Sequence, residues 1–172
     1  LSSEQQLKDQ FVIASFDDRR NIIREGVASL EKTISGRAVI DDALLDEVSA
    51  LNEWPVPLMG HFDRHFLEVP SEALISSMKE HQKYFHLIDD NDNLLPAFIT
   101  VANIKSNDPS QVVAGNERVI RPRLADAAFF YENDRLVSLE QRRESLKKVV
   151  FQDKLGSVFD KTVRVSNLCS LL

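Results

Sequence analysis

Two apolar segments separated by a short polar one constrain the fold of this chain more than any other feature. Residues 84–88 (YFHLI) and 94–104 (LLPAFITVANI) are rich in β-branched and aromatic residues, and the DDNDN between them consists of residues that favour turns. This pattern predicts an antiparallel hairpin with a five-residue loop. Two strands alone are marginally stable in water, so we expect the helix that follows Pro70 to cover part of one face.

Helical periodicity predicts two helices before the hairpin. Apolar residues recur at helical spacing over 22–34, and the expected N-cap of this first helix is Asp17 or Asp18. The second helix is expected to begin at Asp41 or Asp42 and to stop before the next prolines, because proline lacks the amide hydrogen that a helix interior needs.

Prolines also limit what residues 54–69 can form. These residues are predicted to be extended, and Pro55 and Pro57 restrict them to an edge strand or a loop. Pro70 suits the first turn of a helix, which we expect to run to about Gln82.

The C-terminal third is predicted to be helical. Residues 111–133 are expected to form a helix that is interrupted or kinked near Gly115 and Pro122. A capping box at Ser138 opens a second helix, predicted to continue through residues 146–150.

The fold class that follows is α+β. Helices flank a small antiparallel sheet whose central hairpin spans about 84–104, and the C-terminal third is helical. We expect one domain over 1–155, with a helical N-terminal part over 1–53, and a separate helical element over 156–172 that begins at Ser157.

Composition and charge narrow the function classes. No apolar run is long enough to span a membrane, and the single cysteine, Cys169, cannot form an internal disulfide, so we expect a cytoplasmic protein. The net charge of −6 is uneven: residues 1–110 carry 10 Lys and Arg against 19 Asp and Glu, whereas residues 111–172 carry 11 against 8. This asymmetry hints at a basic surface on the later part of the chain, but a plain solvated helical surface is the favoured interpretation.

Catalytic and metal-binding motifs do not stand out in the sequence. The chain has only five glycines, and neither of the glycine-rich phosphate-binding motifs occurs. His61 and His65 have the spacing of two helical metal ligands, but the neighbouring prolines argue against a helix there. We therefore predict no catalytic residue, no metal site and no cofactor in this chain.

Two stretches combine basic and aromatic residues, which is typical of RNA-binding segments because cations neutralise phosphates and aromatic rings stack on unpaired bases. One contains Lys79 and Lys83 before Tyr84 and Phe85, and the other contains three arginines before FFY. The candidate nucleic-acid-binding residues are Arg118, Arg121, Arg123, Lys79 and Lys83. The alternative is that the aromatic side chains fill a core and the arginines pair with nearby acidic residues.

Four blocks of sequence carry a resemblance to a known family. They are EWPVPLMGHFDRHFLEVPSEALISSMKEHQKYF at 53–85, LLPAFITVANIKSNDP at 94–109, GNERVIRPRLADAAFFYENDR at 115–135 and FQDKLGSVFDKT at 151–162. Together they resemble an internal segment of the β subunit of the bacterial two-subunit glycyl-tRNA synthetase, and the resemblance covers nearly the whole chain.

The resemblance implies a part in an ATP-dependent ligase that joins glycine to tRNA-Gly. That enzyme is a heterotetramer of two α and two β chains, with the ATP, magnesium and glycine sites on α and tRNA binding on β. The expected partners are therefore the α subunit and tRNA-Gly, with no membrane and no DNA, and the isolated chain is predicted to be inactive. The resemblance also implies that 156–172 begins a helical HD-type domain. Two alternatives stay open: a scaffold that docks onto α without RNA contact, and a hydrolytic editing-type module.

Overall fold

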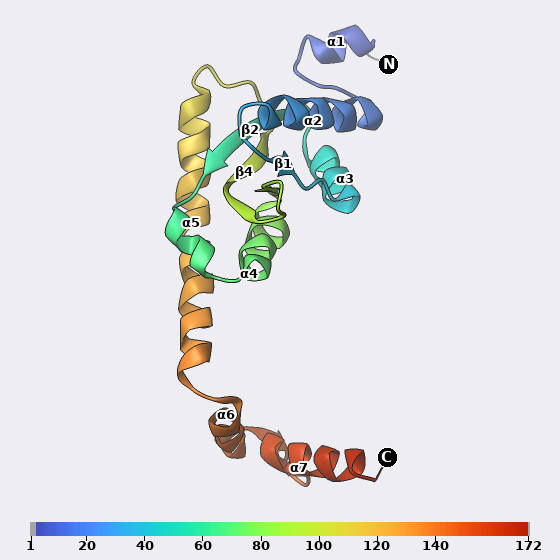
Figure 1. Ribbon diagram of the computed structural model, residues 1–172. Helices are drawn as coiled ribbons and strands as arrows, with labels where there is room; N and C mark the ends of the chain where they lie inside the picture. The colour runs from blue at the N-terminus through green and yellow to red at the C-terminus, as the bar shows by residue number, and fades with distance from the viewer. Residues whose placement is uncertain (1–2, 172) are drawn as a thin grey trace. The chain divides into compact units, whose positions relative to one another are not determined.

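A four-stranded antiparallel sheet forms the centre of the computed structural model, which describes residues 3–171 (Figure 1). The strand order is β1-β3-β4-β2. The strands are β1 (Arg37–Ala38), β2 (Val56–His61), β3 (Phe85–Ile88) and β4 (Leu94–Ala102). With the helices around this sheet, the α+β class is confirmed.

The predicted hairpin is confirmed as β3 and β4. Phe85 pairs with Ile99 and His86 with Phe98 in antiparallel register. The turn is held by Asp89, whose Oδ1 accepts hydrogen bonds of 2.8 Å from the backbone N–H groups of Asn91 and Asn93. The polar DDNDN segment therefore forms a turn because an aspartate side chain accepts the hydrogen bonds of backbone N–H groups that have no partner in the strands.

One face of the sheet packs against α2 (Phe16–Glu31) and α3 (Asp42–Leu51). The shared core contains apolar side chains from both helices and from alternate strand positions: Ile23, Val27, Leu44, Leu45, Val48, Phe85, Leu87, Ala97 and Ile99. Gly26 permits a close approach of α2 to β2, because a Cβ there would lie 2.6 Å from a ring carbon of Pro57.

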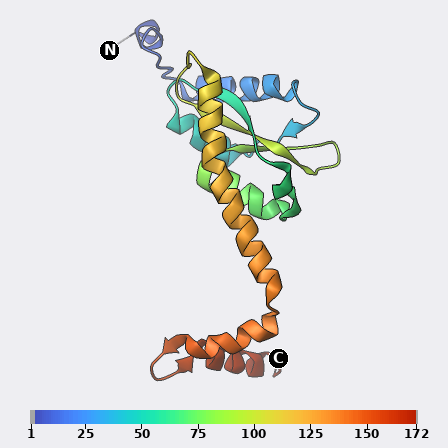
Figure 2. The same ribbon diagram turned by 90° about the vertical axis from the view of Figure 1, so that its left-hand side faces the viewer.

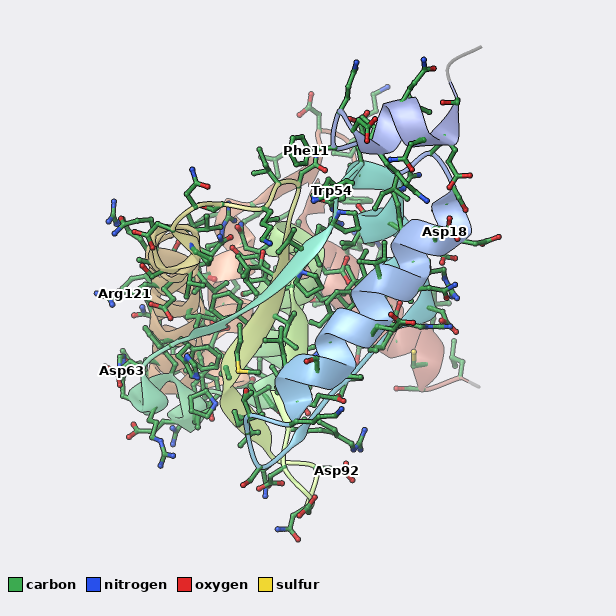
Figure 3. All side chains as sticks on the ribbon, turned by 90° about the horizontal axis from the view of Figure 1, so that it is seen from above. Phe11, Asp18, Trp54, Asp63, Asp92 and Arg121 are labelled. Atoms are coloured by element: carbon green, nitrogen blue, oxygen red, sulfur yellow. The ribbon has the colours of Figure 1, made fainter. Side chains whose placement is uncertain are left out.

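The other face is covered by the N-terminal part of α5 (Pro109–Leu136), which buries Ile120 and Leu124, and Figure 3 has this part of α5 and α2 on opposite sides of the sheet. Phe98 points to this side, where its ring stacks on Tyr84 at 4.5 Å. The helix predicted after Pro70 is α4 (Ser71–Ser76), continued by a π-helical turn (Ser77–His81) that contacts β3.

The proline-rich segment behaves as predicted in its first part only. β2 is an edge strand, which tolerates Pro57 because an edge strand has one side without ladder hydrogen bonds. Residues 64–68 were expected to be extended, but they form a 3₁₀ turn, η1 (Arg64–Glu68). The side chain of Asp63 caps this turn by accepting a hydrogen bond from the N–H of His65.

Two details of the predicted helices are corrected. The N-cap of α2 is Ser15, whose hydroxyl accepts from the N–H of Asp18, so both predicted aspartates lie in the first turn. α5 runs as one helix through Gly115 and Pro122, so the predicted interruption does not occur, and the alternative of a kink stays a prediction. The second helix was predicted correctly: Asp41 caps α3 by accepting from the N–H of Leu44.

The structure divides into two compact units, residues 1–128 and 129–172. The first unit holds the sheet and, near its start, α1 (Glu4–Lys8). The second contains α6 (Leu139–Ser145), η3 (Leu146–Lys148), β5 (Val150–Gln152), β6 (Gly156–Ser157) and α7 (Val158–Cys169). The predicted boundary at 155/156, and with it the HD-type assignment, stays a prediction.

The second unit confirms two predicted helix starts and corrects one helix. Capping boxes open α6 at Ser138 and α7 at Ser157. Residues 146–150, predicted to be helical, instead form the 3₁₀ turn and enter a small β-ribbon, in which Val150 pairs with Ser157. Among the described residues, no helix is both long and apolar enough to cross a membrane.

Candidate nucleic-acid interface

The orientation of α5 on the sheet decides where the predicted arginines lie. Its side toward the sheet consists of the half-buried Asn116 and the buried Ile120 and Leu124, which follow helical spacing. The amide oxygen of Asn116 accepts a 2.6 Å hydrogen bond from the hydroxyl of Tyr84, and Ile120 and Leu124 have no exposed surface. These contacts fix the rotation of the helix about its axis and leave the opposite side to solvent (Figure 2).

The three predicted arginines are all exposed, but they do not share one face. Arg118 and Arg121 are separated by three residues, so their side chains are neighbours on the helix surface. At 3.6 residues per turn, Arg123 is rotated by about 160° from Arg121. Arg123 is near enough to Tyr84 to oppose the burial that raises the pKa of this phenol to about 12. The arginines thus divide into an adjacent pair and a single residue.

Arg118, Arg121 and Arg123 keep their guanidinium groups free within the described part of the chain. No ion pair or side-chain hydrogen bond in residues 3–171 involves any of them. Internal pairing of these three arginines, the alternative considered from the sequence, is therefore absent there. We define Arg118 and Arg121, on the solvent side of α5, as the arginine face.

The two predicted lysines are placed differently. The Nζ atom of Lys79 lies 2.9 Å from Asp41, and that of Lys83 lies 2.9 Å from Glu47. The ion pair with Lys79 is the main cause of the lowered pKa of Asp41. Both ammonium groups are therefore engaged by α3, and they do not join the arginine face.

Acidic groups border the arginine face. Glu117 accepts a 2.8 Å hydrogen bond from the backbone N–H of His61, at the end of β2. The pKa of Asp63 is lowered, first by the hydrogen bond from His65 and to a smaller extent by the positive charge of Arg121. Asp63 and Arg121 lie at the same edge of the molecule in Figure 3. The surface is thus mixed in charge, with its free positive groups on α5.

A hollow of about 520 Å³ opens between the end of β2 and the start of β4. We name it the β2–β4 hollow. Its lining residues are Ile34, Ser35, His61, Phe62, Arg64, Leu95, Pro96 and Ala97. Sequence reasoning missed these residues as a site, although HFDRHF at 61–66 combines basic and aromatic residues and gave the same type of signal as the two stretches that were selected.

Histidine, cysteine and carboxylate side chains are the remaining candidates for metal or redox chemistry. Within residues 3–171, no three His, Cys, Asp or Glu side chains are grouped as metal ligands. Cys169 is a free, exposed thiol near the end of α7.

Comparison with known proteins points to one family. The family model described as "Glycyl-tRNA synthetase beta subunit" matches residues 2–172. Relatives named "Glycine--tRNA ligase beta subunit" include those of Marinobacter nauticus, 68% identical over 94% of this chain, and Hahella chejuensis, 57% identical over 93%. A third, from Stutzerimonas stutzeri, is 55% identical over 96% of the chain. The chain spans about a quarter of the length of these relatives, namely 23%, 23% and 24%.

Proposed function

The chain belongs to the glycyl-tRNA synthetase beta subunit family, and we propose that it is a tRNA-contacting and architectural segment of a glycine–tRNA ligase. In this proposal, ATP, magnesium and glycine bind to a separate α subunit, and the segment described here supports the reaction without carrying it out. The partners are the α subunit and tRNA-Gly.

The observation that carries the proposal is the free arginine face on α5. An exposed guanidinium that has no carboxylate partner loses nothing internal when it binds a phosphate. Two such groups on neighbouring positions of one helix present several N–H donors to adjacent phosphates, because three-residue spacing brings their side chains together. The acidic residues of the first 110 positions make the rest of this unit a poor surface for a polyanion.

The test is a double variant, Arg118→Ala with Arg121→Ala, in the full-length β subunit assembled with its α subunit. We expect weaker binding of tRNA-Gly, and a plot of log affinity against log salt that becomes shallower by roughly one unit for each phosphate that is no longer neutralised. Arg123→Ala alone should have a smaller effect, because this side chain is on another side of the helix.

A charge-matched control separates phosphate contact from net charge. Lys8→Ala with Arg24→Ala removes the same two charges from side chains that already pair with Glu4 and Asp42, so tRNA affinity should change little. Unchanged tRNA affinity in a folded Arg118→Ala, Arg121→Ala variant would contradict the proposal.

A docking scaffold without RNA contact is the second candidate. It is favoured by the exposed apolar side chains of the second unit, among them Phe129, Phe130 and Leu139. Their exposed fractions of 61%, 64% and 87% are high for residues with no partner to bind. Under this alternative, substituting these three residues weakens association with the α subunit, and the arginine variants leave tRNA affinity unchanged.

A further inference from the structure

The β2–β4 hollow combines an apolar floor with a free positive charge. Phe62, Leu95 and Pro96 are half-buried and form part of its lining. Arg64 is exposed at its edge, and within residues 3–171 its side chain makes no ion pair and no hydrogen bond. Small-molecule sites of this size are likewise mostly apolar, with a few polar groups that fix orientation.

These groups match the chemistry of a nucleotide. A base presents a flat apolar surface that stacks on aromatic or apolar side chains, and its phosphate accepts hydrogen bonds from a guanidinium. A base in a double helix is stacked on its neighbours and is not free to enter a hollow, whereas an unpaired base is free to do so. The hollow therefore suits single-stranded rather than duplex RNA.

Two contacts connect residues at the hollow with α5, the helix that carries the arginine face. His61, which lines it, donates its backbone N–H to Glu117, the residue before Arg118. Arg64 follows Asp63, whose carboxylate is within electrostatic reach of Arg121. Both contacts lie in the first unit, so one RNA strand can contact the hollow and the arginine face together.

We propose that the β2–β4 hollow receives one unpaired nucleotide of an RNA whose neighbouring phosphates lie against Arg118 and Arg121. This inference rests on the proposed function, because it assumes that the arginine face contacts tRNA. It adds a preference among RNAs, since the hollow selects RNA that has a single-stranded part over RNA that is fully paired.

The test compares two labelled RNA hairpins that differ only in a short single-stranded 3′ extension. The variants Phe62→Leu and Arg64→Gln are made in the full-length β subunit assembled with the α subunit. Phe62→Leu keeps an apolar side chain but removes the aromatic ring, and Arg64→Gln removes an exposed charge. Arg24→Gln, whose side chain pairs with Asp42 and does not line the hollow, is the control.

We expect Phe62→Leu to weaken binding of the extended hairpin about tenfold and to leave the blunt hairpin unchanged, because one base no longer stacks on an aromatic ring. Arg64→Gln should weaken the extended hairpin and reduce its salt slope by about 0.7, the value for one phosphate of a single strand. Arg24→Gln should affect neither RNA.

Several results would overturn the inference. Equal losses for both hairpins, or no loss with Arg64→Gln, would show that no unpaired nucleotide occupies the hollow. Displacement of the extended hairpin by micromolar AMP would assign the hollow to a free nucleotide, and weaker α–β association with unchanged RNA binding would assign it to a protein partner. Failure of the proposed function gives a different result. In that case, Arg118→Ala with Arg121→Ala would bind each hairpin as tightly as the wild-type protein does.

Discussion

Tyr84 joins the sheet to α5 through one buried hydroxyl group. Its side chain is only 3% exposed, stacks on Phe98, and donates to Asn116, which also accepts a long hydrogen bond from Thr100. Asn116 in turn donates to the carbonyl of Val112 one turn earlier in α5. This set of contacts fixes which side of α5 faces solvent, and hence where Arg118 and Arg121 lie.

Replacing Tyr84 with Phe should lower the free energy of unfolding by about 1 kcal/mol at pH 8, because the ring still packs but one buried hydrogen bond is removed. The effect should depend on pH. Burial raises the pKa of Tyr84 to about 12, above the value of about 10 expected in the unfolded chain, so the stabilisation is complete below about pH 10 and decreases as the pH rises from about 10 towards 12.

Urea unfolding of both proteins between pH 8 and pH 11.5 checks this expectation. The advantage of the wild-type protein over Tyr84→Phe should disappear near pH 11, since each pH unit above 10 costs about 1.4 kcal/mol. A constant difference across this range would mean that the phenol is not buried as described.

At the scale of elements, α5 carries an unusual proline. Pro122 lies inside the helix and has no N–H to donate to the carbonyl of Arg118 one turn earlier. Pro122 is exposed, so water can hydrate that carbonyl, and the buried side chains of Ile120 and Leu124 hold the helix on the sheet. Tertiary packing therefore keeps α5 continuous against the local preference of its sequence.

Replacing Pro122 with Ala should restore the missing hydrogen bond and raise the free energy of unfolding by roughly 1–3 kcal/mol, the range expected for proline in a helix interior. Pro109→Ala is the matched control. Pro109 is the first residue of α5, where its missing N–H has no helical partner to lose, so this change should be close to neutral. Equal effects of the two substitutions in urea unfolding would contradict this account of α5.

The elements that sequence reasoning predicted are those determined by local pattern. The β3–β4 hairpin follows from two apolar runs and a turn-forming segment, and α3 from Asp41 and the apolar positions after it. The continuity of α5 was not predictable in this way, because it depends on packing against strands that are distant in sequence. The β2–β4 hollow has the same origin, since Ile34, Phe62 and Leu95 meet only in the folded chain.

The fold distinguishes among the predicted site residues in a way that residue type could not. Residue type alone selected Lys79, Lys83 and the three arginines. Only the fold separates lysines that pair with Asp41 and Glu47 from arginines that face solvent without a partner in the described chain. Helix geometry then separates Arg123 from the arginine face.

At the scale of the whole molecule, the two compact units differ in whether they bury apolar side chains. Every side chain of the hydrophobic core belongs to the first unit, and none of residues 129–171 is buried. The second unit is held by contacts at its surface, such as Phe159 under the cationic groups of Arg143 and Lys147 at 5.1 and 4.7 Å. Contacts of this kind are weak where water competes for the charge.

We therefore expect backbone amides of the second unit to exchange hydrogen faster than those of the first unit when the 172-residue chain is measured at neutral pH. The matched comparison is α3 with α7, which have 10 and 12 residues and a side-chain cap each. α3 buries Leu44, Leu45, Val48 and Ser49, whereas α7 has no buried residue.

Amides of a helix without core contacts exchange by local opening, and those of a core helix exchange only in larger and costlier openings. Amides of α7 should thus exchange faster than those of α3 by roughly 100-fold or more, which corresponds to an opening about 3 kcal/mol less costly. Protection of α7 equal to that of α3 would mean that the second unit has a stabilising core of its own, in conflict with the exposure of its side chains.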